Sequence, residues 1–469
     1  MTGWQDFYNS IKGPHWPLCD VEDQFTNLPK HIQKECIDKF GYVPGTYSKT
    51  SKLSSKRFPI KTATACQLKW NWSTVYLPME TTASCHRTNL HKFDTKTFNF
   101  HNTPTKVDDR KRMLEGQWPE VGCDYCKDIE ASGGQSDRIT NLDFPGMHAP
   151  WELEDNPNAV NVTPRILEVY FDNTCNLKCL YCGPHFSSLW AGDISQHGEF
   201  RQDGVKIAQF VKSSNIDQNK QKLFDWLKDN AQHLTSFNVL GGEPLYQDEL
   251  DQCLDLFEQF PAPELTFQFF TNLNTKLSHL QRVINRVKDL IDKKCIRELE
   301  ITASLDCWGA EQEYVRYPLK LDVWEKNFEF LVNQPWIRLI VSSTITPLTI
   351  KTLPDLLEKL NTWRQLRPIY HYQNSVNNVE YMYIDIFGDA FRADFDKAIS
   401  LKPEGTPEEI QSKRYLEGIA QQASKQLPKV EEIKNLYIYL NEIDRRRGTS
   451  WPTTFPWLVD EFKKFNLGE

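Results

Sequence analysis

The sequence predicts an α/β protein with a parallel sheet at its centre. Between residues 161 and 376, short runs rich in β-branched and aromatic residues alternate with charged stretches that have apolar residues at helical spacing. Repeated strand and helix units of this kind are typical of a parallel sheet covered by helices. A chain of 469 residues is long enough for two or three domains, and we expect them at residues 1–160, 161–376 and 377–469.

Six strands are expected in the central domain, because six short apolar runs are bounded by turn residues. They cover residues 165–172, 235–242, 265–272, 298–306, 337–345 and 367–373. The segments 221–234, 248–260 and 323–334 have apolar residues at helical spacing and are predicted to be outer helices. Cys253 belongs to the apolar stripe of the second helix, which indicates a buried side chain and not a ligand.

The two flanking regions differ from the central region in composition and in the spacing of their apolar residues. Residues 1–160 are rich in Pro, Thr, Asn and Lys and show little periodicity, which predicts a loop-rich domain. The C-terminal region is predicted to be helical, with an apolar stripe that ends before Gly448, a residue type common at helix ends. The stripe consists of Val430, Ile433, Leu436, Leu440 and Ile443.

Composition narrows the classes of function. A net charge of -8 argues against nucleic acid as a partner, because nonspecific phosphate binding needs an excess of Lys and Arg. The sequence has no recognisable export signal and no apolar run of about 18 residues, so we expect a cytoplasmic protein that does not enter a membrane. With 12 cysteines in a reduced compartment, metal or cluster ligation is favoured over disulfides.

The most specific motif is the segment YFDNTCNLKCLYC, which places Cys175, Cys179 and Cys182 in a C-x3-C-x2-C pattern directly after the first predicted strand. A cubane 4Fe-4S cluster is usually held by four thiolates, one per iron. Three cysteines on one short loop therefore leave one iron open to a ligand. The alternatives are a zinc site completed by the nearby His185 and unligated core cysteines.

At these residues the sequence resembles the radical S-adenosylmethionine (SAM) superfamily, whose signature has this spacing and an aromatic residue before the third cysteine, here Tyr181. The resemblance implies a partial (β/α)6 barrel with its chemistry at the carboxyl ends of the strands. It also implies that the open iron binds SAM, and that one electron from the reduced cluster releases a 5′-deoxyadenosyl radical that abstracts hydrogen from a substrate. Tyr181 is expected to pack beside the cluster or the adenine.

Further candidates for SAM binding follow the second and fourth predicted strands. Gly241, Gly242 and Glu243 resemble the glycine-rich motif of the superfamily, in which glycines let the backbone approach the ligand and a carboxylate accepts hydrogen bonds from the SAM amino group. Ser304 and Asp306 are expected to hydrogen-bond the ribose hydroxyls. The alternatives are an ordinary Gly-Gly turn and strand capping by the Ser and Asp side chains.

A second ligand set is predicted in the N-terminal region. Cys123 and Cys126 form a C-x2-C pair, and Cys66 and Cys85 complete a set of four, with His86 as a substitute ligand. Such a set suits either zinc or a 4Fe-4S cluster. The surrounding segments resemble twitch, the small auxiliary-cluster domain related to SPASM, although here it precedes the barrel. We therefore expect an auxiliary 4Fe-4S cluster, with structural zinc or scattered, unligated thiols as the alternatives.

The sequence gives less specific predictions for the remaining cysteines and for the partners of the protein. No cysteine follows Cys307, which excludes a full C-terminal SPASM domain; Cys307 itself is expected to pack at the barrel mouth or to donate hydrogen. Cys19, Cys36 and Cys295 belong to no ligand set. The resemblance implies an external one-electron donor such as flavodoxin or ferredoxin, and a peptide or small-molecule substrate. A non-catalytic iron-sulfur or zinc-binding regulatory protein is the alternative function.

Overall fold

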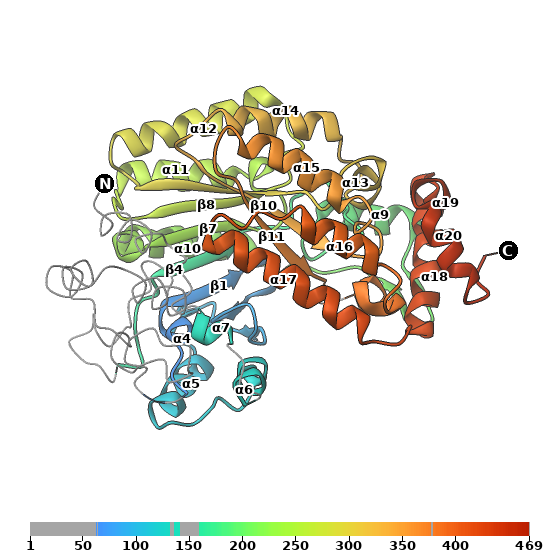
Figure 1. Cartoon of the computed structure of the whole chain (residues 1–469). Helices are drawn as coiled ribbons and strands as arrows, with labels where there is room; N and C mark the ends of the chain where they lie inside the picture. Colours follow the sequence, from blue (N-terminus) through green and yellow to red (C-terminus); the bar gives the residue numbers. More distant parts are fainter. Residues whose placement is uncertain (1–61, 63, 132–135, 141–158, 377–378, 469) are drawn as a thin grey trace, which may run out of the picture. The chain divides into compact units, whose positions relative to one another are not determined.

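The chain folds into two compact units (Figure 1). The computed structural model describes residues 62, 64–131, 136–140, 159–376 and 379–468. The described residues of unit 1 lie within Met1–Tyr76, Glu80–Glu168 and His233–Thr235, and those of unit 2 lie within Leu77–Met79, Val169–Gln232 and Ser236–Glu469.

Unit 2 is built on a parallel sheet. Its strands follow the order β11-β10-β9-β8-β7-β4, and each neighbouring pair from β7 to β11 is parallel. The strands are β4 (Ile166–Tyr170, whose first residues belong to unit 1), β7 (Ser236–Leu240), β8 (Thr266–Thr271), β9 (Glu298–Ser304), β10 (Arg338–Ile345) and β11 (Tyr370–Ser375). All six lie where strands were predicted, which confirms a mixed α/β fold with a parallel sheet. The (β/α)6 barrel stays a prediction.

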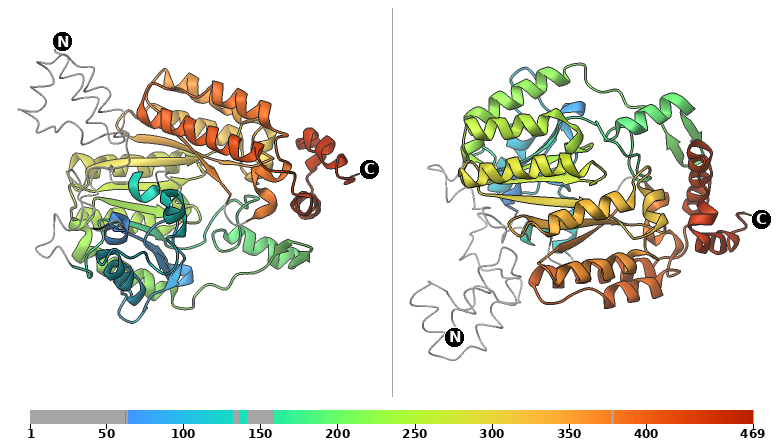
Figure 2. Two further views of the ribbon diagram at one scale, coloured as in Figure 1. Left: turned by 60° about the horizontal axis from the view of Figure 1, so that its bottom comes forward. Right: turned by 90° about the horizontal axis from the view of Figure 1, so that it is seen from above.

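Helices follow the strands and pack on their neighbours along the chain. They include α10 (Ile216–Asn230), α11 (Asp248–Gln259), α12 (Leu277–Asp292), α14 (Leu321–Val332) and α15 (Leu353–Arg364). Contacts join α10 to α11, α11 to α12, and α12 to α14, and two views show α11, α12 and α14 along one face of the sheet (Figures 1 and 2). Cys253 of α11 is fully buried among apolar side chains, as predicted.

The C-terminal region of unit 2 is helical, as predicted. Its helices are α16 (Arg392–Ser400), α17 (Pro407–Ser424), α18 (Val430–Arg447), α19 (Trp451–Thr454) and α20 (Pro456–Lys463). Helix α17 packs on β11, so this region shares a unit with the sheet. Gly448 ends α18 in a left-handed conformation with φ 65°. The predicted apolar stripe is buried except for Val430, which is 57% exposed at the first turn of the helix.

Unit 1 consists of short elements. Strands β1 (Trp72–Tyr76), β2 (Thr81–Ala83) and β3 (His91–Lys92) pair antiparallel. The helices are α4 (Gln67–Asn71), α5 (Pro104–Leu114), α6 (Asp124–Ala131) and α7 (Asp137–Thr140). The core of this unit is partly polar, because Lys106 and Arg110 of α5 are completely buried. The Lys106 ammonium donates to four oxygens, those of Ser73, Thr82, Ala83 and Phe100.

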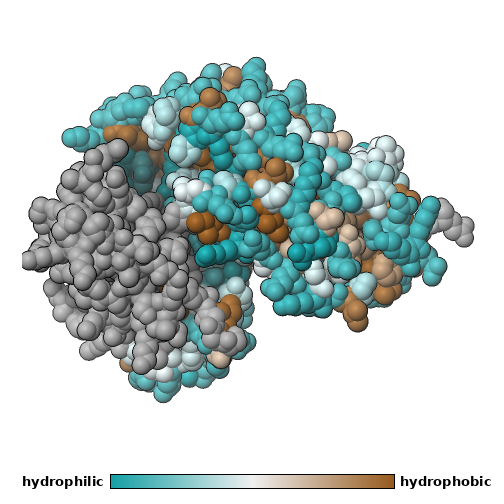
Figure 3. All heavy atoms as spheres, viewed as in Figure 1, coloured by the Kyte–Doolittle hydropathy of each residue, from teal (hydrophilic) through white to brown (hydrophobic). Residues whose placement is uncertain are grey.

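One face of the molecule is mainly polar where the structure describes it. The face drawn in Figure 3 is dominated by hydrophilic residues, with apolar residues in small groups. Exposed apolar side chains such as Val211, Leu366 and Leu427 are far apart in the sequence, and single exposed apolar residues are normal for a folded protein. Within the described part of the chain, every helix is too short or too polar to cross a membrane.

Candidate cluster and cofactor sites

The three cysteines of the C-x3-C-x2-C motif lie on the loop between β4 and α9 (Ser188–His197). The middle of this loop pairs with a segment more than 130 residues further along the chain. The Lys178 N–H donates to the Tyr317 carbonyl at 2.7 Å, and the Leu180 N–H donates to the Val315 carbonyl at 2.9 Å. Backbone hydrogen bonds thus fix the course of the loop that carries the sulfur atoms.

The thiols of this loop are poorly solvated. Cys179 is buried, and Cys175 and Cys182 are partly exposed. Burial raises the pKa of all three, that of Cys182 to about 12. The free thiols are therefore neutral near pH 7, and ligation by thiolates must release protons. His185, the alternative zinc ligand, packs against Phe210 with ring centroids 4.3 Å apart.

The Gly-Gly-Glu segment after β7 packs directly on the cysteine loop. Gly241 and Gly242 have φ values of 78° and 60°, a region that favours glycine. A Cβ atom on Gly241 would lie 2.3 Å from the Tyr170 ring, and one on Gly242 would lie 2.2 Å from the Thr174 carbonyl oxygen. The Glu243 N–H donates to the same carbonyl at 2.8 Å. The glycines thus permit contact with the loop itself, a reason that the sequence did not reveal; their role toward SAM stays a prediction.

Glu243 is 1% exposed and links the ends of β7 and β8. Its Oε1 atom accepts hydrogen bonds from the Leu245 N–H at 3.2 Å and the Thr271 hydroxyl at 2.7 Å. Its Oε2 atom accepts one from the Asn272 N–H at 2.6 Å. Burial raises the pKa of Glu243 to about 7, although these hydrogen bonds oppose the shift. Since each carboxylate oxygen has two lone pairs, Oε2 retains capacity for another donor.

Asn176 was missed by the sequence analysis, although it lies between two of the cysteines. Its side-chain amide donates to the Asn274 carbonyl at 2.7 Å, and its side-chain oxygen accepts from the Asn272 amide at 2.8 Å. The cysteine loop is therefore tied to the carboxyl end of β8 as well as to that of β7. Its place inside the C-x3-C spacing is the signal that points to this residue.

Asp306 is completely buried beside the cysteine loop. Its Oδ2 atom accepts hydrogen bonds from Arg316 Nε at 2.8 Å and the Tyr181 hydroxyl at 2.6 Å. Its Oδ1 atom accepts from Arg316 Nη2 at 2.9 Å and the Thr344 N–H at 2.8 Å. These internal donors fill the usual capacity of both oxygens, so Asp306 acts here as a structural acceptor. Its contact with a ribose stays a prediction, as does that of the partly exposed Ser304 at the end of β9.

The other cysteines of unit 2 are buried. Cys295 and Cys307 are 6% and 0% exposed. The Cys307 thiol lies 3.6 Å from the side-chain oxygen of Gln312, and burial raises its pKa. These contacts favour packing, and hydrogen donation by Cys307 stays a prediction. Cys19 and Cys36 lie outside the described residues.

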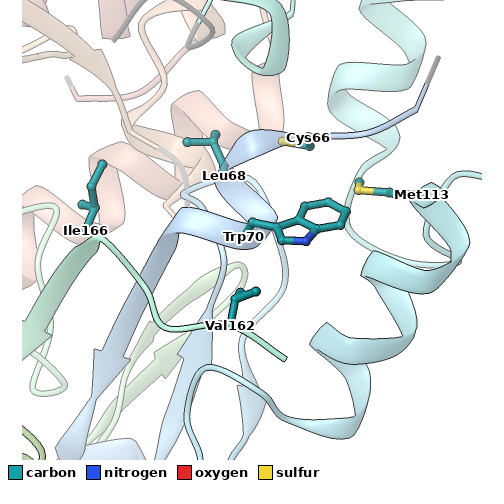
Figure 4. Close-up of a cluster of buried hydrophobic side chains, with 6 residues drawn as sticks. All are labelled: Cys66, Leu68, Trp70, Met113, Val162 and Ile166. Carbon is teal, nitrogen blue, oxygen red and sulfur yellow. The ribbon is translucent and has the colours of Figure 1, made fainter. Parts of the chain in front are cut away.

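Unit 1 brings its four predicted ligands to one cavity of about 180 Å³, lined by Cys66, Cys85, Cys123 and Cys126. Cys66 precedes α4 and belongs to an apolar cluster around Trp70 (Figure 4). Cys85 and Cys123 pack against the same cluster. Gly122, with φ 84°, places the start of α6 so close to the turn after Cys85 that a Cβ atom would lie 3.2 Å from a backbone nitrogen there.

Two cations line the same cavity. Lys69 is buried and lies 2.5 Å from Asp109; burial lowers its pKa, but the charges of Cys123 and Asp109 outweigh this and raise it. Arg138 is buried and donates to the Ala65 carbonyl at 2.7 Å. Sequence analysis missed both residues. Arg138 also pairs with Glu130, so both cations at this cavity already have a carboxylate partner.

The thiols of unit 1 have raised pKa values. Burial raises the pKa of Cys66 to about 12 and that of Cys123 to about 11, and it also raises that of Cys126. His86 lines the cavity, and its Nε2 atom lies 3.7 Å from Glu168 Oε1. In the described parts of both units, no three His, Cys, Asp or Glu side chains are close enough together to hold a single metal ion. The thiols of each site are nevertheless of the ligand type that iron-sulfur clusters use.

Comparison with known proteins gives no match to a family model and none to a curated protein. Among solved structures, the chain is similar to anSMEcpe with bound AdoMet and Kp18Cys peptide, at 13% identity and a TM-score of 0.30, over 50% of this chain and 57% of that one. It is also similar to Streptococcus suis SuiB bound to S-adenosylmethionine, at 14% identity and a TM-score of 0.32, over 66% of this chain and 63% of that one. This chain thus spans less than two thirds of either protein, and likenesses at this level do not establish a function.

Proposed function

We propose that this protein is a radical SAM enzyme whose catalytic cluster is held by Cys175, Cys179 and Cys182. The observation that carries the proposal is the hydrogen bond between the Glu243 N–H and the Thr174 carbonyl. It joins the three-cysteine loop to the Gly-Gly-Glu segment, which is more than 60 residues away in the sequence. A ligand set with one open iron and a buried carboxylate therefore belong to one site.

The residues around the cysteine loop have different roles in the proposed site. Glu243 Oε2 accepts a hydrogen bond from the SAM amino group, for which it has a lone pair left. Asp306 neutralises Arg316 and orients Tyr181, and these contacts help to fix the course of the loop. When bound and reduced, the cluster supplies the electron that cleaves SAM to a 5′-deoxyadenosyl radical. Parallel strands with helices along one face support the partial (β/α)6 barrel that this assignment implies.

We further propose that unit 1 is a twitch-like domain with one auxiliary 4Fe-4S cluster on Cys66, Cys85, Cys123 and Cys126. Four thiols around one cavity support this assignment. Zinc held by the same four thiols is the alternative. Tetrahedral zinc places its sulfur ligands about 3.8 Å apart, from a Zn–S distance of about 2.3 Å, so the four cysteines must close on the ion.

The partners follow from the chemistry. A one-electron donor such as flavodoxin or ferredoxin reduces the cluster, and a peptide or a small molecule supplies the hydrogen atom. The protein's own contribution is to position SAM and to exclude water and oxygen from the site.

The deciding experiment is anaerobic reconstitution with iron and sulfide, followed by iron analysis and chromatography for 5′-deoxyadenosine. We expect about eight irons per chain and SAM cleavage in the presence of dithionite. The triple variant Cys175→Ala, Cys179→Ala, Cys182→Ala should lose about four irons and all cleavage, whereas the control Cys253→Ala, Cys295→Ala should lose neither. Unchanged iron in the triple variant would refute the ligand assignment, and a full cluster without SAM cleavage would favour the regulatory alternative.

A further inference from the structure

The C-terminal helix α18 reaches the cysteine loop. The Tyr439 hydroxyl donates to the Leu180 carbonyl at 2.6 Å. Arg447, the last residue of α18, donates to the carbonyls of Lys178 and Tyr314. Figures 1 and 2 show the same helix in red at the C-terminal end of the chain. The residues that surround the cysteine loop therefore include a helix that the sequence analysis treated only as an extension.

Three consecutive arginines end this helix, and they differ in their partners. Arg445 is exposed and pairs with Glu442. Arg446 is completely buried and pairs with both Glu442 and Asp193. Arg447 lies between the rings of Trp190 and Tyr317, with its guanidinium carbon 5.3 and 5.1 Å from their centroids. Its described hydrogen bonds go only to carbonyls, and no described carboxylate pairs with it.

Such a cation needs an anion. The Nε atom of Arg447 is buried and has no hydrogen-bond partner among the described residues, and a desolvated charge is costly unless it is compensated. The cysteine loop supplies a group that becomes negative on metal binding, because Arg447 donates to the carbonyl of Lys178, the residue before Cys179. Trp190, whose ring lies against Arg447, donates to the Cys179 carbonyl at 2.8 Å. A second cation beside the loop is Arg316, whose guanidinium carbon lies 5.5 Å from the centre of the Tyr181 ring.

The two cations are not equivalent. Arg316 forms a bidentate pair with Asp306, so its positive charge is already compensated. Arg447 forms no such pair among the described residues. Asp193, a carboxylate that interacts with it at longer range, already pairs with Arg446 and Lys178, so the charge of Arg447 is left for the centre that the loop binds. The net charge around a cluster is one of the determinants of its reduction potential, and a nearby cation stabilises the reduced, more negative state.

We propose that Arg447 is the counter-cation of the cluster on Cys175, Cys179 and Cys182, and that helix α18 thereby raises the reduction potential of this cluster. This inference rests on the function proposed above. Arg447 acts as a positioning and charge-compensating residue, and it is not placed in contact with SAM or substrate. Tyr439 keeps the helix seated on the loop through its bond to the Leu180 carbonyl.

The test is a redox titration of the reconstituted protein, followed by electron paramagnetic resonance of the reduced cluster, in protein whose unit 1 cysteines are replaced so that one cluster is observed. At a fixed potential, Arg447→Gln should lower the ratio of reduced to oxidised cluster about tenfold, which is 59 mV for a one-electron couple. In Arg447→Lys, the ratio of reduced to oxidised cluster should stay within about threefold of the parent's ratio (about 28 mV). The matched control Arg445→Gln removes the same charge from the same helical turn and should leave the ratio unchanged.

The results for these variants distinguish charge compensation by Arg447 from a packing role. Full iron in Arg447→Gln with an unchanged ratio would overturn the inference, as would an equal shift in Arg445→Gln. If Arg447→Gln fails to retain iron, then retention by Arg447→Lys supports compensation by charge, and loss from both variants assigns Arg447 to packing alone and overturns the inference. A parent protein that binds no cluster on this loop would instead refute the proposed function.

Discussion

The hydroxyl of Tyr181 donates a 2.6 Å hydrogen bond to the carboxylate of Asp306. Tyr181 lies between the second and third cysteines of the loop, and Asp306 follows β9, so the bond ties the loop to the fourth predicted strand. The guanidinium carbon of Arg316 lies 5.5 Å from the centre of the Tyr181 ring and completes the arrangement. The aromatic residue of the cysteine motif is thus part of a buried charge network.

Replacing Tyr181 by Phe tests this bond. The hydroxyl donates to a buried carboxylate, so Tyr181→Phe should lower the free energy of unfolding by about 1.5–3 kcal/mol. The measurement is urea denaturation of the protein without iron. The control Tyr246→Phe removes an exposed hydroxyl, which bonds the Asn274 carbonyl at 3.3 Å, and should change stability by less than about 0.5 kcal/mol. Equal losses in the two variants would contradict the assignment.

Gly242 and Gly192 form a matched pair for substitution by alanine. At Gly242, φ is 60° and the new Cβ meets the Thr174 carbonyl at 2.2 Å, so Gly242→Ala should displace the cysteine loop and reduce its iron content. At Gly192, inside α9, no atom lies within 4 Å of the new Cβ. Gly192→Ala should retain iron and gain about 0.5–1 kcal/mol of stability. Iron analysis and denaturation check both expectations, and full iron in Gly242→Ala would show that the loop tolerates the displacement.

Glu243 should make stability depend on pH. Its pKa in the folded state is raised from 4.5 to about 7, so the folded protein holds this proton more tightly than the unfolded chain does. The stabilising contribution is complete below pH 4.5 and is lost as pH rises through about 7. Unfolding of the iron-free protein between pH 4.5 and 8 should therefore show a steeper decline for the parent than for Glu243→Gln. Parallel curves for the two proteins would exclude a raised pKa.

The same variant tests SAM recognition in the loaded protein. In the proposed site, the Glu243 carboxylate accepts a hydrogen bond from the SAM amino group. Glu243→Gln should therefore weaken SAM binding by about tenfold to a hundredfold, because a charge-assisted hydrogen bond is lost. The iron content should not change. SAM titration followed by the visible spectrum gives the affinity. The control Glu258→Gln, on the exposed face of α11, should bind SAM as the parent does; a loss shared by both variants would point to net charge instead.

Replacing Cys123 and Cys126 by Ala separates the two sites. We expect the loss of about four irons with SAM cleavage still detectable, because the loop in unit 2 does not use these ligands. The measurements are metal analysis and 5′-deoxyadenosine formation. Stoichiometric zinc with only about four irons in protein made under iron-replete conditions would replace the auxiliary cluster by a zinc site.

The sequence predicted the sheet of unit 2 well, because buried parallel strands have a local signature. Strands such as β8 (Thr266–Thr271) and β10 (Arg338–Ile345) are runs of β-branched and aromatic residues between turn signals. It also predicted that Cys253 is a buried residue of a helix, because the helical spacing of apolar residues is likewise visible within a short stretch of sequence. Unit 1 offered no such signal, because β3 has two residues and the buried face of α5 contains Lys106 and Arg110.

The residues that complete the candidate sites could not be predicted in this way. Asn176 and Arg447 are polar residues in ordinary surroundings of the sequence, and each acquires its role from partners far along the chain. Asp306 shows the converse. Its position after a strand suggested a free acceptor, but in the structure donors from Arg316, Tyr181 and Thr344 fill its capacity. Contacts between distant segments, and not local propensity, determine which polar groups remain available.

The bond between Arg447 and the Lys178 carbonyl spans 269 residues, which has a consequence for biosynthesis. A ribosome makes the cysteine loop early and α18 late, and domains fold as units while the chain emerges. The loop therefore lacks two of its supports, from Tyr439 and Arg447, until translation has passed residue 447. If the loop holds the proposed cluster, lasting insertion should accordingly follow the synthesis of α18, and the three thiols must be kept reduced in the interval.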